Sequence, residues 1–155
     1  MNSDNYRTAL GKAMALCSKS EKCISDIKNK LINWALTSDE ENESLIHELI
    51  ENNFIDEKRY ALSFTLDKYR FNKWGRIKIR AMLKARGLKE QDIVYGLGAI
   101  DNDSYLQMIE AEIICKKNSL KAKNTFEMKG KLLRFASSRG YENEFVYELI
   151  DSLGF

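Results

Sequence analysis

The chain contains an internal repeat in which apolar residues recur after 52 and then 53 residues. Four apolar positions occur three times each in this register. The sets are Ile27, Ile79 and Leu132; Leu31, Leu83 and Ala136; Leu36, Leu88 and Tyr141; and Leu45, Leu97 and Ile150. A period of this length is typical of stacked supersecondary units, because one unit alone has too few apolar residues to bury.

The repeat predicts an all-α fold of three tandem three-helix repeats that form an elongated, curved molecule. The absence of proline and the abundance of helix-forming residues favour helices over a sheet with many turns. The repeats are expected at residues 1–55, 56–100 and 101–155. The expected helices are 4–18, 23–35, 38–53, 56–71, 73–86, 89–99, 102–117, 124–138 and 141–153. The alternative is one compact globule of the same helices.

A glycine follows the second predicted helix in two of the three repeats. Gly87 and Gly140 stand where a helix C-terminus favours a left-handed residue, and Ala35 occupies this place in the first repeat. The sequence therefore predicts that the helix before Ala35 ends in another way.

Positive charge is concentrated in the middle of the chain. The net charge is +2, but residues 56–100 alone carry 11 basic and 5 acidic side chains. Arg76, Arg80 and Lys84 would form one stripe on a helix, with no acidic residue nearby in the sequence to balance them. Arginine matches the geometry of phosphate and carboxylate groups, so the segment is a candidate surface for a polyanion or an acidic protein. The candidate residues are Lys68, Arg70, Lys73, Arg76, Lys78, Arg80, Lys84 and Arg86. The alternative is a solvated face without a partner.

The same segment carries a family resemblance. The stretches "IDEKRYALSF" and "KYRFNKWGRIKI", with "CSKSEKCISDIKNKL" before them and "KLLRFASSRGY" after them, resemble the RecX regulatory proteins. The positions that match the family are expected to be mainly fold determinants. They are Asp56, Arg59, Tyr60, Ala61, Trp74, Gly75, Ile79 and Leu83.

The resemblance implies a regulator that lodges in the groove of the RecA filament on single-stranded DNA. There it would bridge neighbouring subunits and suppress ATP hydrolysis and strand exchange, and so modulate recombination, DNA repair and the SOS response. Two alternatives remain open from the residues alone. One is an autonomous nucleic-acid-binding protein that uses the same cations, and the other is a helical scaffold for an unrelated acidic protein.

The sequence offers little for catalysis. It has one histidine, His47, which lies among glutamates and is expected at the surface, and it has no phosphate-binding glycine loop. Cys17 and Cys23 lack the spacing of metal ligands. We therefore expect a non-enzymatic monomer without cofactor, metal or small-molecule substrate. The chain shows no signal peptide and no apolar stretch of membrane-spanning length, so we expect a cytoplasmic protein that does not enter the membrane.

The three cysteines predict a reduced protein, because their number is odd and no pair has the spacing of a redox motif. Thermal melts with and without dithiothreitol should give the same Tm. A large fall in Tm on adding the reductant would contradict this prediction.

Overall fold

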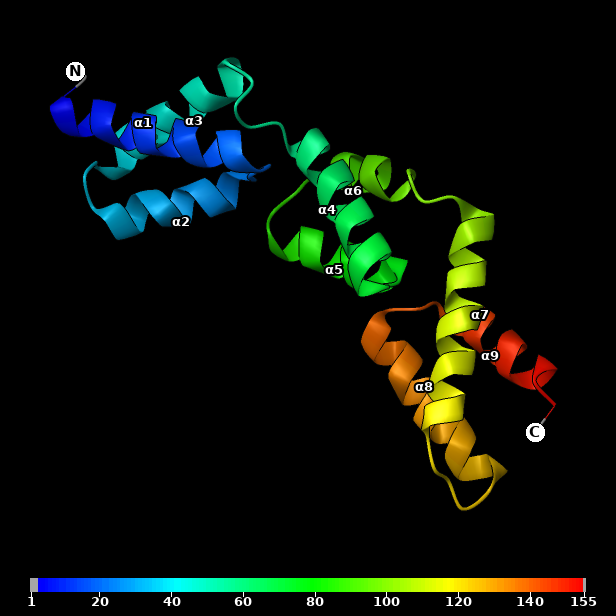
Figure 1. Cartoon of the computed structure of the whole chain (residues 1–155). Coiled ribbons are helices and arrows are strands. Elements are labelled where there is room, and N and C mark those ends of the chain that lie inside the picture. Colours follow the sequence, from blue (N-terminus) through cyan, green and yellow to red (C-terminus); the bar gives the residue numbers. More distant parts are fainter. Residues whose placement is uncertain (1–2, 155) are drawn as a thin grey trace. The chain divides into compact units, whose positions relative to one another are not determined.

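The computed structural model describes residues 3–154, and these residues form nine helices with no strand among them (Figure 1). The predicted all-helical fold is therefore confirmed. Every expected helix is present, with ends within three residues of the expected ones. The helices are α1 (Asp4–Lys19), α2 (Ile24–Trp34), α3 (Asp39–Glu51), α4 (Glu57–Asn72), α5 (Arg76–Ala85), α6 (Glu90–Leu97), α7 (Asn102–Ser119), α8 (Thr125–Arg139) and α9 (Asn143–Ser152). None of these described helices is both long enough and apolar enough to cross a membrane.

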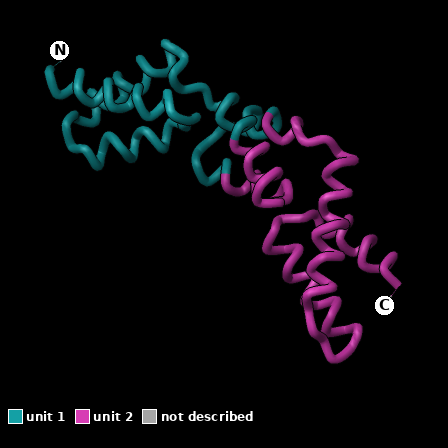
Figure 2. The backbone as a smooth tube through the Cα atoms, in the orientation of Figure 1, with its two compact units in different colours: residues 1–63, 83–95 teal, residues 64–82, 96–155 magenta. Residues whose placement is uncertain are grey.

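The chain divides into two compact units (Figure 2). Unit 1 comprises Met1–Ser63 and Leu83–Tyr95, and unit 2 comprises Phe64–Met82 and Gly96–Phe155. Helices α4 and α5 each contribute residues to both units. The division into three repeats stays a prediction, and the outermost residues of the ranges 1–55 and 101–155, which are residues 1, 2 and 155, lie outside the described residues.

In unit 1, helices α1, α2 and α3 pack around an apolar core. Each buried aliphatic or aromatic side chain in such a core contributes about 1.5–3 kcal/mol. The hydroxyl of Tyr6 donates to the Glu48 carboxylate at 3.1 Å, which satisfies the polar end of a buried ring. Helix α3 begins with a capping box, in which Ser38 and Glu41 each accept from the other's backbone N–H. The core residues are Tyr6, Ala9, Ala13, Ile27, Leu31, Leu45, Ile46, Leu49 and Ile55.

One set of the repeated apolar positions is fully buried, as the sequence predicted. Ile27, Ile79 and Leu132, which are 52 and 53 residues apart, are each 0 % exposed. They lie on α2, α5 and α8, the second helix of each expected repeat. The residues that recur in the sequence at this spacing therefore occupy buried positions on the second helix of each expected repeat.

The end of α2 differs from the prediction. Ala35 has φ 53° and ψ 35°, in the left-handed region, and its N–H donates to the Leu31 carbonyl at 3.2 Å. The expectation that this helix ends in another way is wrong, since Gly140 ends α8 in the same region. A left-handed alanine costs about 1 kcal/mol or more. Its neighbours Trp34 and Leu36 pack against the unit 1 core, and their burial offsets that cost.

In unit 2, the turn between α4 and α5 meets the turn between α8 and α9 at two glycines. The N–H of Gly75 donates to the Arg139 carbonyl at 2.7 Å, and the N–H of Ile77 donates to the Gly140 carbonyl at 3.1 Å. A Cβ atom on Gly75 would lie 2.2 Å from the Gly140 oxygen, and one on Gly140 would lie 2.4 Å from the Lys78 Cβ. We call this meeting of Gly75 and Gly140 the glycine contact. Only glycine permits such a close approach of two backbones.

The glycine contact predicts a large difference between two glycine-to-alanine changes. Gly75→Ala should lower the free energy of unfolding by about 3 kcal/mol, because relieving the overlap breaks backbone hydrogen bonds as well as packing. Gly11, which lies in α1 with nothing within 4 Å of its added Cβ, is the matched control. Gly11→Ala should stabilise by about 0.5–1 kcal/mol. Urea unfolding of both variants measures this, and equal stabilities would contradict the structural role of the contact.

Candidate partner-binding surface

The eight cations predicted from the sequence fall in both units. Lys84 and Arg86 belong to unit 1, and the other six belong to unit 2. The unit 2 cations lie on the last turns of α4, on the turn that follows it, and on α5. They are Lys68, Arg70, Lys73, Arg76, Lys78 and Arg80. Their contacts separate those that are used within the fold from those that face solvent.

Arg76 is used within the fold. Its guanidinium pairs with the Glu142 carboxylate at 3.3 Å, donates to the Asn102 side chain at 3.2 Å, and stacks over the Tyr105 ring at 4.1 Å from the centroid. The expectation that no carboxylate balances this stripe is wrong for Arg76. Glu142 lies 66 residues further along the chain, so only folding brings the two charges together.

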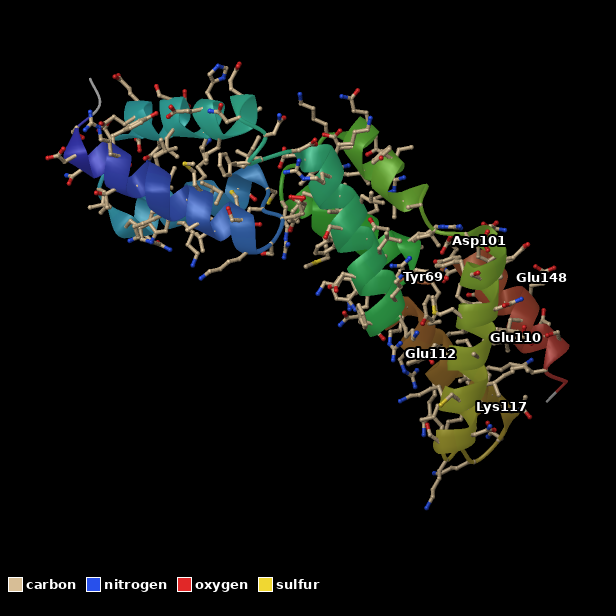
Figure 3. The ribbon with its side chains drawn as sticks, turned by 45° about the horizontal axis from the view of Figure 1, so that its top comes forward. Tyr69, Asp101, Glu110, Glu112, Lys117 and Glu148 are labelled. Carbon is tan, nitrogen blue, oxygen red and sulfur yellow. The ribbon has the colours of Figure 1, made fainter. Side chains whose placement is uncertain are left out.

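Tyr105 links these charges to the backbone of α5. Its hydroxyl donates to Glu142 and accepts from the Arg76 N–H at 2.9 Å. Burial of the ring, and then its hydrogen bond to the carboxylate, raise the pKa of Tyr105 well above its ordinary value. The ring centroids of Tyr69 and Tyr105 lie 6.1 Å apart, and Tyr69 is on the part of α4 that faces α7 (Figure 3). These contacts make Arg76, Tyr105 and Glu142 one satisfied polar cluster.

Two lysines of unit 2 lie against the indole of Trp74. The ammonium groups of Lys68 and Lys78 are 5.1 Å and 4.4 Å from the ring centroid. Lys78 also donates to the Ser138 carbonyl at 3.2 Å. Cation–π contacts of this kind are worth about 0.5–1 kcal/mol at exposed sites. Both lysines therefore have partners inside unit 2 as well as any outside it.

In unit 1, Arg86 has a partner within the fold, whereas Lys84 does not need one because it is exposed. Arg86 donates to the hydroxyl of Tyr60, a ring that is 5 % exposed and whose pKa burial raises to about 12. Lys84 is exposed. Arg86 thus supports the fold, and Lys84 presents its charge to solvent.

The α4–α5 turn of unit 2 also exposes apolar side chains. Phe71 is 79 % exposed and Ile77 is 52 % exposed, and Arg70 beside Phe71 is exposed as well. We call Arg70, Phe71 and Ile77 the turn surface. Sequence reasoning singled out Arg70 of this surface but missed Ile77. The signal was available, because Ile79 faces inward and a residue two positions before it on a helix points away from the core.

The potential metal ligands of the described residues do not cluster. No group of three or more His, Cys, Asp or Glu side chains among them could hold a metal ion. His47 is at the surface, as predicted, with its side chain 74 % exposed and 3.2 Å from Glu51. The turn surface combines a large apolar area with a cation, which suits a macromolecular partner.

Comparisons with known proteins identify the family. The family model described as RecX, second three-helix domain, matches residues 56–94. A regulatory protein RecX of Haemophilus ducreyi is 30 % identical over 145 residues, which cover 93 % of this chain and 91 % of that protein. The chain belongs to the RecX family.

Further members of the RecX family agree with this assignment. The regulatory protein RecX of Clostridium acetobutylicum is 28 % identical over 158 residues, covering 97 % of this chain and 71 % of that protein. The crystal structure of RecX from Lactobacillus salivarius covers 97 % of both chains with a TM-score of 0.79 and 15 % identity. A second crystal structure, of a regulatory protein RecX, has a TM-score of 0.86 and 21 % identity, and covers 96 % of this chain and 74 % of that one. The two crystal structures establish the shared fold of tandem helical repeats.

Several positions that carry the RecX resemblance have structural roles here. The carboxylate of Asp56 accepts from the N–H groups of Lys58 and Arg59 at 3.0 Å and 3.2 Å, which confirms that it caps α4. Arg59 pairs with Glu21, and Gly75 forms the glycine contact. These three positions of the RecX resemblance therefore stabilise the packing of the region and do not belong to the turn surface.

The contacts of Arg76 predict a measurable coupling to Glu142. Alanine at either position should lower the free energy of unfolding by about 1.5–3 kcal/mol, since both charges are three-quarters buried and hydrogen-bonded. In a double-mutant cycle the pair should couple by about 1 kcal/mol or more. The pair of Lys131 and Glu127, one helical turn apart and about one-third exposed, is the control and should couple more weakly. Equal coupling in the two cycles would show that Arg76 behaves as a solvated surface cation and not as part of the fold.

Proposed function

We propose that this chain is a regulator of the RecA recombinase, which binds the RecA filament on single-stranded DNA and inhibits its ATPase and strand exchange. The carrying observation is membership of the RecX family over 93 % of the chain, since the relatives are named regulatory proteins. The resemblance implies that binding occurs in the filament groove. In this proposal the protein acts as a cytoplasmic monomer that modulates recombination and DNA repair, without a cofactor.

The contacts of the cations support a selected set of partner-binding residues. Arg76 and Arg86 already have partners within the fold, and Lys68 and Lys78 lie against Trp74. Arg70 and Lys84 are exposed, so their charges can meet phosphates or carboxylates at little cost to the fold.

Phe71 and Ile77 support a partner that includes protein. Binding energy at protein interfaces is concentrated in buried aromatic and arginine side chains, with apolar neighbours that exclude water. Phe71 with 79 % of its surface exposed, next to Arg70 in the chain, has this composition. The aliphatic side chain of Ile77 offers no ring on which a base could stack, which favours a protein surface over a nucleic-acid track.

The proposal is tested by RecA-catalysed ATP hydrolysis on single-stranded DNA with substoichiometric amounts of this protein. Inhibition well below one molecule per RecA subunit supports action on the filament, because coating the DNA would need near-stoichiometric amounts. Undiminished hydrolysis at equimolar protein would refute the proposal.

Variants of the turn surface sharpen this test. Arg70→Glu with Phe71→Ala should raise the concentration for half-inhibition by tenfold or more, because the loss of a buried aromatic and a charge contact costs about 1.4 kcal/mol or more. Lys84→Glu should have a smaller effect of the same sign. The control is Lys28→Glu with Lys30→Glu, two exposed lysines on α2. Circular dichroism and Tm should match the parent in all of them, and full inhibition by the well-folded turn-surface variant would place the binding surface elsewhere.

A change to Glu of all three residues of the predicted stripe, Arg76, Arg80 and Lys84, would be a poorer test. Arg76→Glu would set a second carboxylate against Glu142 inside unit 2. Loss of folding would then be confused with loss of binding. The exposed residues Arg70 and Lys84 avoid this difficulty.

A further inference from the structure

The last third of the chain has strongly separated charges. Residues 116–131, which we call the α7–α8 tip, carry six lysines and one glutamate. The rest of residues 101–155 carries two arginines and eight acidic side chains. The separation follows the fold, since the tip comprises the end of α7, the connector and the start of α8. Figure 3 shows Lys117 near this end of α7, and Glu148 on α9.

The connector of the tip is held by its own hydrogen bonds. The ammonium of Lys131 donates to the Lys121 carbonyl at 2.7 Å, and the Asn124 side chain caps α8 by accepting from the Glu127 N–H at 2.9 Å. The Glu127 carboxylate pairs with Lys131 at 3.2 Å. The hydrogen bond from Lys131 lowers the pKa of Glu127, which keeps this pair charged. The one carboxylate of the tip is thus paired with Lys131, and Lys121 and Lys123 are exposed to solvent.

An exposed aromatic side chain stands among these lysines. Phe126, in the first turn of α8, is 87 % exposed, the highest value among the exposed large apolar residues of the described chain. Lys121 and Lys123 before it are exposed, and Lys129 after it is half-buried. A single exposed aromatic is ordinary by itself. Its position in the chain between Lys123 and Lys129, next to a connector held by hydrogen bonds, is what indicates a ligand.

The composition of the tip indicates which ligand. The cations of residues 116–131 are all lysine, which binds phosphate as a point charge, and Arg134 beside Gly130 adds a guanidinium that also matches phosphate. An exposed phenyl ring can stack on a base only where that base is unpaired. Lysines along a backbone with an aromatic ring for stacking is the usual chemistry of single-strand binding.

We propose that the α7–α8 tip binds single-stranded nucleic acid, with Phe126 stacked on one unpaired base and Lys121, Lys123 and Lys129 in contact with the flanking phosphates. The site is separate from the turn surface and from the predicted cations of residues 68–86. It requires no RecA, so it goes beyond the proposed function and can fail or succeed independently of it.

Fluorescence anisotropy of a labelled 12-nucleotide single strand, with the full chain and no RecA, tests the proposal. Phe126→Ala should weaken binding by about fivefold or more, the effect of losing one stacked base. Lys121→Glu with Lys123→Glu should weaken binding at least as much. It should also reduce the magnitude of the slope of log affinity against log salt concentration by about 1.4, since each lost phosphate contact on a single strand contributes about 0.7 to that slope.

Matched controls separate the tip from general charge and exposure. Lys28→Glu with Lys30→Glu makes the same charge change on α2, and Tyr147→Ala removes another exposed aromatic ring, on α9. Both should bind the strand like the parent, apart from the uniform effect of net charge. The blunt duplex of the same sequence should bind the parent more weakly than the single strand and should not respond to Phe126→Ala.

Three results would overturn the proposal. The first is parental binding by the tip variants with unchanged circular dichroism. The second is a loss in the lysine variant without any loss in Phe126→Ala, which would leave only nonspecific charge. The third is unchanged strand binding together with lost inhibition of RecA ATPase by the tip variants, which would assign the tip to a protein partner.

Discussion

Unit 2 depends on a contact between two backbones. Gly75 and Gly140 approach so closely that a Cβ atom on either would overlap the other turn. The two hydrogen bonds across the contact, from Gly75 to Arg139 and from Ile77 to Gly140, join the α4–α5 turn to the α8–α9 turn. A third, from the Tyr141 hydroxyl to the Lys73 carbonyl at 2.7 Å, lies beside them. The contact thereby fixes where α5 begins and which side chains of that turn reach solvent.

The glycine contact also determines which cations near the α4–α5 turn have partners within unit 2 and which are exposed. With the turns joined, Arg76 reaches Glu142 and Tyr105, and Lys78 reaches the Ser138 carbonyl. Arg70 and Phe71, on the other side of the turn, remain exposed. One run of cations therefore divides into two groups, since some have partners within unit 2 and others are exposed. Counting charge along the sequence treats them as equal.

Much of the fold could be predicted because it follows from short-range rules. The period of 52 and 53 residues located Ile27, Ile79 and Leu132, and their burial needs only the helical spacing of apolar residues. Asp56 was expected to be a fold determinant, and in the structure its carboxylate caps α4. The left-handed Ala35 was not predictable, because the burial of its neighbours decides whether the strain is tolerated.

The candidate site was less predictable, because its contacts join distant parts of the sequence. The partner of Arg76 lies 66 residues away, and no local pattern announces that Glu142 will meet it. The exposure of Ile77 could be read from the register of α5, whereas that of Phe126 depends on how the α7–α8 connector folds back. Local patterns thus identify which residues are charged or apolar, and long-range packing decides which of them a partner can reach.

The span of the glycine contact has a consequence for the order of folding. A ribosome makes the α4–α5 turn long before residues 139–141, which it must meet, and closing so long a loop is slow. The α1–α3 core of unit 1 needs no residue beyond Ile55 and can form while synthesis continues. During that interval the peptide groups of Gly75 and Ile77 lack their native acceptors. The glycine contact is thus completed only after residue 140 has been synthesised.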